Sequence, residues 1–114
     1  MKLLAAALII GHAVVVDGDT LKIDGQSYRF WGVDSPERDT PAGREARRAL
    51  IQIIDDREVR CEDTGGRSYR RIVAKCFVGK MDLACELVRL GHARDWPRFS
   101  KGYYRGCATR DNSR

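Results

Sequence analysis

The stretch that decides the fold is residues 12–33, HAVVVDGDTLKIDGQSYRFWGV, because it reads as three short strands joined by two tight turns. Apolar and β-branched residues at 12–16 and 20–23, and alternating aromatic residues at 26–33, are typical of β-strands. Asp-Gly pairs at 17–18 and 24–25 favour reversal of the chain. The stretch therefore predicts a three-stranded meander.

The remaining chain predicts two more strands and two to three helices. We expect a helix at 43–55, where apolar residues recur at helical spacing, then strands at 58–62 and 71–78 around a turn at 64–66. A second helix is expected at 81–91, and a third at about 100–110, where few apolar residues form a stripe. Five short strands with an intervening helix suggest an α+β fold, a five-stranded OB-fold β-barrel in one domain.

The 114 residues carry a net charge of +5 and a pI of about 9.3, which favours polyanions as partners. Acidic residues outnumber basic ones in residues 1–37, whereas bases and aromatic residues mix from residue 94 onward. An acidic pocket beside a basic, aromatic flank suits a metal-assisted enzyme that acts on a phosphodiester. The alternative is a solvated helix face.

The N-terminal residues 1–13, MKLLAAALIIGHA, place a lysine before an apolar run. They resemble a short secretory signal with a cleavage site at 11–13, or they form the start of the first strand. The run is too short to span a bilayer. We expect a secreted or periplasmic protein, and a cytoplasmic one if these residues are not a signal.

The four cysteines do not indicate a zinc site, because none forms a C-x-x-C pair and the two histidines lie far apart. Cys61 and Cys76 lie on strands that are expected to pair. They form a disulfide in an exported protein or remain two buried thiols. Cys85 and Cys107 have no evident partner by spacing.

Carboxylates lie at the ends of two predicted strands. Asp19 follows the first strand and Asp34 the third, so the meander brings them to one rim, where they repel each other unless a cation lies between them. A hard divalent cation also accepts a backbone carbonyl such as that of Ser35, and it can polarise a phosphoryl oxygen. Glu37 lies outside this pair and is free to accept a proton from water, while Arg29 suits a phosphate. The alternative is that Asp-Gly-Asp-Thr is an ordinary turn.

Four stretches carry a resemblance to a known family: VVDGDTLKI at 15–23, YRFWGVDSPE at 28–37, YRRIVAKC at 69–76 and DLACELVRLGHA at 82–93. Over about residues 12–100, within a domain expected at 12–110, the chain resembles the staphylococcal-type thermonucleases. The resemblance implies an OB-fold barrel that cleaves DNA and RNA with calcium. It implies calcium ligands at Asp19, Asp34 and the Ser35 carbonyl, and a water-activating or water-orienting Glu37. It also implies a phosphate clamp of Arg29 and Arg71, with Tyr69 near the terminal phosphate.

Three departures from the family qualify these assignments. The family usually has Tyr-Gly-Arg where this chain has Tyr69-Arg70-Arg71, so a positive φ at Arg70 would be strained. The alignment assigns the clamp to Arg71 and leaves Arg70 as a further substrate contact. Ser35 stands where the family usually has threonine. The family usually continues through a full third helix, whereas this chain ends at GCATRDNSR, so the third helix looks truncated and apolar surface would be uncovered.

Two hypotheses from different classes follow. The first is a calcium-dependent nuclease of DNA and RNA with little sequence specificity, which we expect to be monomeric and without a membrane partner. The second is a non-catalytic OB-fold module that stacks bases on Trp96, Tyr103 and Tyr104. The intact set of acids favours the enzyme, because a binder of polyanions gains nothing from carboxylates at its mouth.

Overall fold

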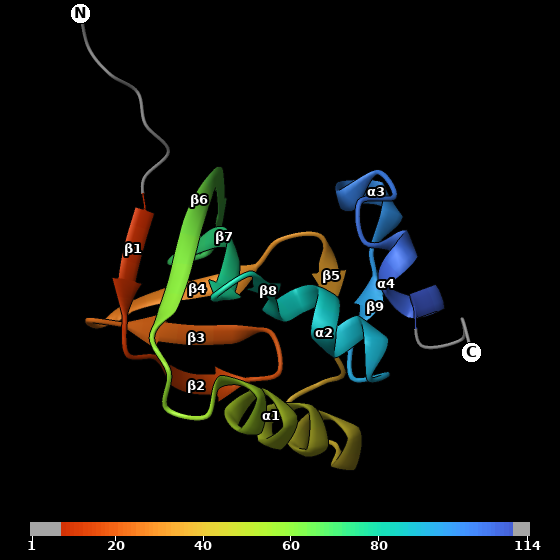
Figure 1. Ribbon diagram of the computed structural model, residues 1–114, viewed down its shortest axis with the longest axis horizontal. Coiled ribbons are helices and arrows are strands. Elements are labelled where there is room, and N and C mark those ends of the chain that lie inside the picture. Colours follow the sequence, from red (N-terminus) through yellow and green to blue (C-terminus); the bar gives the residue numbers. More distant parts are fainter. Residues whose placement is uncertain (1–7, 111–114) are drawn as a thin grey trace, which may run out of the picture.

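The computed structural model describes residues 8–110 and confirms the α+β class, with a seven-stranded sheet, a separate two-stranded sheet, and helices below and to the right of the larger sheet in Figure 1. The predicted meander is present as β2 (Val14–Asp17), β3 (Thr20–Ile23) and β4 (Gln26–Phe30). Asp24 and Gly25 both have positive φ, of 51° and 81°, as a two-residue hairpin turn requires.

The first strand is broken into two pieces. β1 (Leu8–Gly11) pairs with β6 (Val59–Ser68), whereas β2 pairs with β3, and only His12 and Ala13 separate the two. The sheet order is β1-β6-β7-β4-β3-β2, so its two ends are neighbours in the chain, as the OB-type prediction requires. The apolar run expected as a signal begins in residues 1–7, which lie outside the described residues.

The third strand ends earlier than predicted. β4 stops at Phe30, and the two-residue strand β5 (Val33–Asp34) pairs instead with β9 (Arg94–Asp95). Gly32 makes this break, because its φ is +79° and a side chain there would meet the ring of Tyr104 at 3.1 Å. The break brings Asp34 to the chain that follows α2 (Leu83–Arg89).

The turn predicted at 64–66 is wrong. β6 continues through both glycines to Ser68, with an irregular register between Asp63 and Arg67, before β7 (Arg71–Val78) returns. The Asp63 carboxylate stabilises this irregular strand pairing, because it accepts hydrogen bonds from Gly65 N at 2.7 Å and from the Arg67 guanidinium. The hairpin turn therefore lies at residues 69–70. β7 also pairs with β4, in parallel, and with β8 (Met81–Asp82).

The helices lie beside this sheet, below it and to its right in Figure 1. α1 (Pro41–Ile54) begins two residues before the predicted start, because Thr40 caps it and Pro41 occupies its first position. α2 begins two residues late, since Met81 and Asp82 pair with β7. The expected third helix is two short helices, α3 (Pro97–Ser100) and α4 (Arg105–Arg110). None of the helices in residues 8–110 is long and apolar enough to cross a bilayer.

Two disulfides stabilise the domain. Cys61 and Cys76 are directly opposite each other on β6 and β7 and are bonded, which resolves the two alternatives for this pair. Cys85 and Cys107 form a second bond, which joins α2 to α4 and which the sequence spacing did not predict. Tyr104 is also buried against Asp82, so the C-terminal segment packs on the core despite its weak apolar stripe.

Candidate active site

One cleft of about 590 Å³ lies where the β2–β3 turn, β4, the segment after β5 and the β6–β7 hairpin meet. It gathers seven of the eight site residues predicted from the sequence; the eighth, Arg70, is absent from its lining. The lining residues are Asp17, Asp19, Arg29, Asp34, Ser35, Pro36, Glu37, Arg38, Asp39, Tyr69 and Arg71.

Asp17, the last residue of β2, and Asp19, in the turn that follows, have adjacent carboxylates. Asp19 N donates to Asp17 Oδ1 at 3.3 Å, and Thr20 Oγ1 donates to Asp19 Oδ1 at 2.9 Å. Burial, and then the neighbouring Asp17, raise the pKa of Asp19 to about 6, although Arg29 opposes the shift. Burial would also raise the pKa of Asp17, but its hydrogen bonds with Asp19 and Thr20 and the charge of Arg38 outweigh it and lower that pKa.

Arg29 lies beside this pair because β3 and β4 place it directly opposite Thr20. Its guanidinium is 3.5 Å from Asp19 Oδ2, and both side chains are only 14% exposed. Arg29 Nη1 also donates to the Phe30 carbonyl at 2.8 Å. Arg38 Nη2 lies 3.4 Å from Asp17 Oδ2, so each of these two part-buried carboxylates faces one arginine. The cleft lining as a whole holds five carboxylates and three arginines, so its negative charge exceeds its positive charge.

Arg71 enters the cleft from the first residue of β7. Its guanidinium donates to Thr20 Oγ1 at 3.3 Å and, through two further bonds, to the Ser68 carbonyl and hydroxyl. Tyr69 is 95% exposed at the hairpin tip, with the Arg71 guanidinium 5.8 Å from its ring centre. Arg71 is thus held in place from two strands.

Arg70 lies outside the cleft. It is exposed, and its backbone carbonyl accepts a hydrogen bond from Gln26 Nε2 at 3.2 Å. The expectation of a strained φ at Arg70 is wrong, because the positive φ of 58° is at Tyr69. The left-handed residue of the β6–β7 turn is therefore Tyr69, one position before Arg70.

Asp34 and Ser35 approach from the opposite wall. Asp34 is exposed, at the end of β5, where Arg94 is its partner in the strand pair. Ser35 Oγ is buried and has no hydrogen-bond partner among the described residues. It lies against Gly18, where a β-carbon would come within 2.5 Å of it. The two loops that carry the predicted ligands are therefore in direct contact.

The donors available here are all oxygen atoms, which suits a hard cation such as calcium rather than zinc. Within residues 8–110, no group of three or more His, Cys, Asp or Glu side chains is placed to hold a metal ion. A cation at this rim would therefore need backbone carbonyl and water ligands besides Asp19 and Asp34. The raised pKa of Asp19 and the unpartnered Ser35 hydroxyl both fit such an arrangement.

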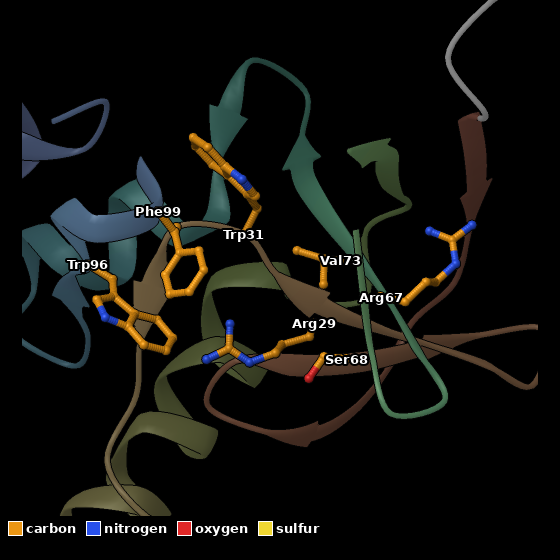
Figure 2. Close-up of a pocket in the computed structure, with 8 residues that line it drawn as sticks. Arg29, Trp31, Arg67, Ser68, Val73, Trp96 and Phe99 are labelled. Atoms are coloured by element: carbon orange, nitrogen blue, oxygen red, sulfur yellow. The ribbon is translucent and has the colours of Figure 1, made fainter. Parts of the chain in front are cut away.

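A second pocket, of about 270 Å³, adjoins the cleft and shares Arg29 with it (Figure 2). Figure 2 shows the Arg29 guanidinium extending toward the rings of Trp96 and Phe99, whereas the Arg67 side chain points away from them. The two rings are 4.5 Å apart, and Arg29 lies 5.7 Å from that of Trp96. The sequence indicates Phe99 only as part of the basic, aromatic flank that begins at residue 94, because nothing local predicts that it reaches Arg29.

The proposed stacking residues do not form one surface. Trp96 lines this pocket, but Tyr104 is 1% exposed and donates its hydroxyl to Asp82 Oδ2 at 3.0 Å. Tyr103 packs edge-on against Trp31, with Lys75 4.2 Å from its ring centre. The prediction that all three aromatic residues stack on bases is therefore wrong for Tyr104, because its ring is buried.

Comparison with known proteins gives a family and several relatives. The family model described as "Staphylococcal nuclease homologue" matches residues 27–106, which is more than half of the chain. The succinoglycan biosynthesis protein ExoI of Rhizobium meliloti is 36% identical over 112 residues, covering 88% of this chain and 59% of that protein.

Two further relatives carry nuclease names. An uncharacterized endonuclease of Haemophilus influenzae is 25% identical over 75% of this chain and 51% of its own length. The probable staphylococcal-like nuclease CAN3 of Oryza sativa subsp. japonica is 27% identical over 64% of this chain and 19% of its own. The chain thus spans less than two thirds of each of these relatives. The extent of the family match, together with the fold, shows that the chain belongs to the staphylococcal nuclease homologue family.

Proposed function

We propose that this protein is a calcium-dependent nuclease that hydrolyses phosphodiester bonds of DNA and RNA with little sequence specificity. The observation that carries the proposal is the single cleft in which two acid-bearing loops face Arg29 and Arg71. Membership of a nuclease family and two relatives with nuclease names support it.

Asp19, Asp34 and the Ser35 carbonyl would hold the calcium ion. When bound, the ion supplies charge that polarises a phosphoryl oxygen and offsets negative charge in the transition state. Without it, Asp19 is a part-buried carboxylate next to Asp17, and this is the environment that raises its pKa.

Arg29 and Arg71 bind the scissile phosphate. Both guanidinium groups are held by the protein, Arg29 by Asp19 and the Phe30 carbonyl and Arg71 by Ser68 and Thr20, so little side-chain entropy is lost when phosphate binds. Such preorganised donors contribute most once charge has developed on the phosphoryl oxygens. Tyr69, exposed at the rim, contacts the adjoining nucleotide.

Glu37 acts on water. It lines the cleft and is exposed, so it is accessible to a water molecule that approaches the phosphorus. The water oxygen forms a bond to phosphorus while its proton passes to the Glu37 carboxylate. The bond to the leaving oxygen breaks, and that oxygen takes a proton from solvent.

A purified sample incubated with plasmid DNA and with RNA, in calcium and in excess chelator, tests the proposal. We expect cleavage of both polymers in calcium and none in chelator. Glu37→Gln should lower kcat by about 10²–10⁴-fold with a much smaller effect on KM, because it removes a general base. Full activity in chelator would refute the calcium requirement, and binding without cleavage would favour a non-catalytic module.

An anionic polysaccharide is the control polyanion in this assay, since the name of one relative refers to succinoglycan biosynthesis. We expect no cleavage of it, because it has no phosphodiester for the arginines to hold. The two disulfides support the proposal that the protein acts in an oxidising compartment, outside the cytoplasm.

A further inference from the structure

The first turns of α1 support both loops of the cleft. A β-carbon at Gly43 would overlap the Glu37 carbonyl oxygen and lie 2.7 Å from the Glu37 carbonyl carbon. One turn further along, Ala46 contacts Gly18, where a β-carbon would be 2.7 Å from the Ala46 methyl group. The Asp17–Asp19 turn and the Glu37 segment therefore rest on neighbouring small residues of one helix.

Thr40 holds the same carbonyl from the other side. Its backbone N–H donates to Glu37 O at 3.2 Å, and its hydroxyl donates to Glu37 O at 2.7 Å. The same hydroxyl accepts a hydrogen bond from Gly43 N at 3.0 Å, as the cap of α1. The helix start and the backbone of Glu37 are thus fastened together by one side chain.

The Glu37 carboxylate has no such support of its own. No hydrogen bond or ion pair with another residue in the described part of the chain engages it, and the side chain is exposed. Its position over the cleft is therefore set by its backbone. That backbone can lie where it does only because position 43 has no side chain.

We propose that Gly43 and Thr40 are positioning residues for Glu37, which they hold at the place in the cleft lining that its action on water requires. The inference rests on the proposed function, in which Glu37 is the base. Glycine in a helix is unfavourable relative to alanine, so helix formation does not explain Gly43, whereas the contact with the Glu37 carbonyl does.

The test is Gly43→Ala, with Gly106→Ala as its matched control. Both glycines are helical, but a β-carbon at Gly106 would meet nothing within 4 Å. In Gly43→Ala the loop must move by about 1 Å or more, and a displacement of that size costs up to ~10²-fold in rate. We expect kcat to fall by about 10²-fold with KM nearly unchanged. Gly106→Ala should match the wild type, and circular dichroism should show the same fold in all three.

A double-mutant cycle separates positioning from general destabilisation. In the Glu37→Gln background, Gly43→Ala should cost little further activity, because the group that it displaces is already inactive. If Gly43→Ala melts far below Gly106→Ala, Thr40→Val and Thr40→Ser replace it. The valine variant should lose kcat by about tenfold or more, and the serine variant should recover it because it keeps the hydroxyl.

Three outcomes overturn the inference. A wild-type kcat in Gly43→Ala, or in Thr40→Val where that pair is used, would show that the contact does not position Glu37. A full additional loss in the Glu37→Gln background would show that Gly43 acts elsewhere. Absence of cleavage by the wild type would refute the proposed function and, with it, the positioning role. This outcome differs from the first two, in which the wild type cleaves nucleic acid.

Discussion

Breaking the disulfide between Cys85 and Cys107 is expected to destabilise the domain by about 3.4 kcal/mol. The bond closes a loop with a sequence separation of 22 residues. By chain entropy, a cross-link of that span removes about 11 cal/mol/K from the unfolded chain, or about 3.4 kcal/mol at 25 °C. The entropy of unfolding for 114 residues is about 0.24 kcal/mol/K. The Cys85→Ala/Cys107→Ala variant should therefore melt about 14 °C lower.

The matched comparison is Cys61→Ala/Cys76→Ala. Its loop spans 15 residues, for which the same relation predicts about 3.0 kcal/mol. Cys61 and Cys76 are 0% and 1% exposed, against 9% for Cys85 and 7% for Cys107. Mild reductant should therefore open the α2–α4 bond first.

The functional consequence follows from the position of the bond. Trp96 and Phe99, which wall the second pocket, lie in the loop that it closes. The Cys85→Ala/Cys107→Ala variant should raise KM for oligonucleotides more than it lowers kcat, measured below its melting temperature. A loss of less than about 1 kcal/mol in urea unfolding, with the Cys61–Cys76 pair intact, would refute the entropic reasoning.

Three further predictions concern the cleft and its charges. Arg71→Ala should lower kcat by about 10²–10³-fold because it removes a preorganised donor, and Arg70→Ala should cost little; the reverse result would place the clamp one residue earlier. Calcium affinity, measured by calorimetry, should rise as the pH rises through about 6, because protonated Asp19 cannot be a ligand. The Asp19→Asn variant should bind calcium weakly at every pH. Equal calcium affinity at pH 5 and 7 in the wild type would contradict the prediction. DNA affinity should fall steeply as the salt concentration rises. The slope should be shallower when three exposed basic residues are neutralised together: Arg98, Lys101 and Arg105. An unchanged slope would show that these residues form a solvated face that does not contact DNA.

Local patterns were sufficient for most of the fold. The alternation of apolar residues and the Asp-Gly turns predicted β2, β3 and the start of β4 because both are properties of a few adjacent residues. The stripe at 43–55 predicted α1 to within two residues for the same reason. The predicted site residues fall together because three of the matched stretches, 15–23, 28–37 and 69–76, contain residues that line the cleft.

Individual contacts that hydrophobic periodicity does not report decided the rest, and some of them are local. The turn of the β6–β7 hairpin lies later than predicted because the Asp63 carboxylate bonds to Gly65 and Arg67. These bonds stabilise an irregular strand pairing at a point where the two glycines alone favour a turn. Cys85 and Cys107 pair because α4 packs on α2, at a separation for which sequence spacing has no rule. The need for glycine at position 43 is evident only from the tertiary structure. The Glu37 carbonyl occupies the space that a side chain at position 43 would take, and the sequence of a helical stretch does not reveal that contact. Periodicity reports which face of an element is apolar, whereas the approach of two backbones depends on how complete elements pack.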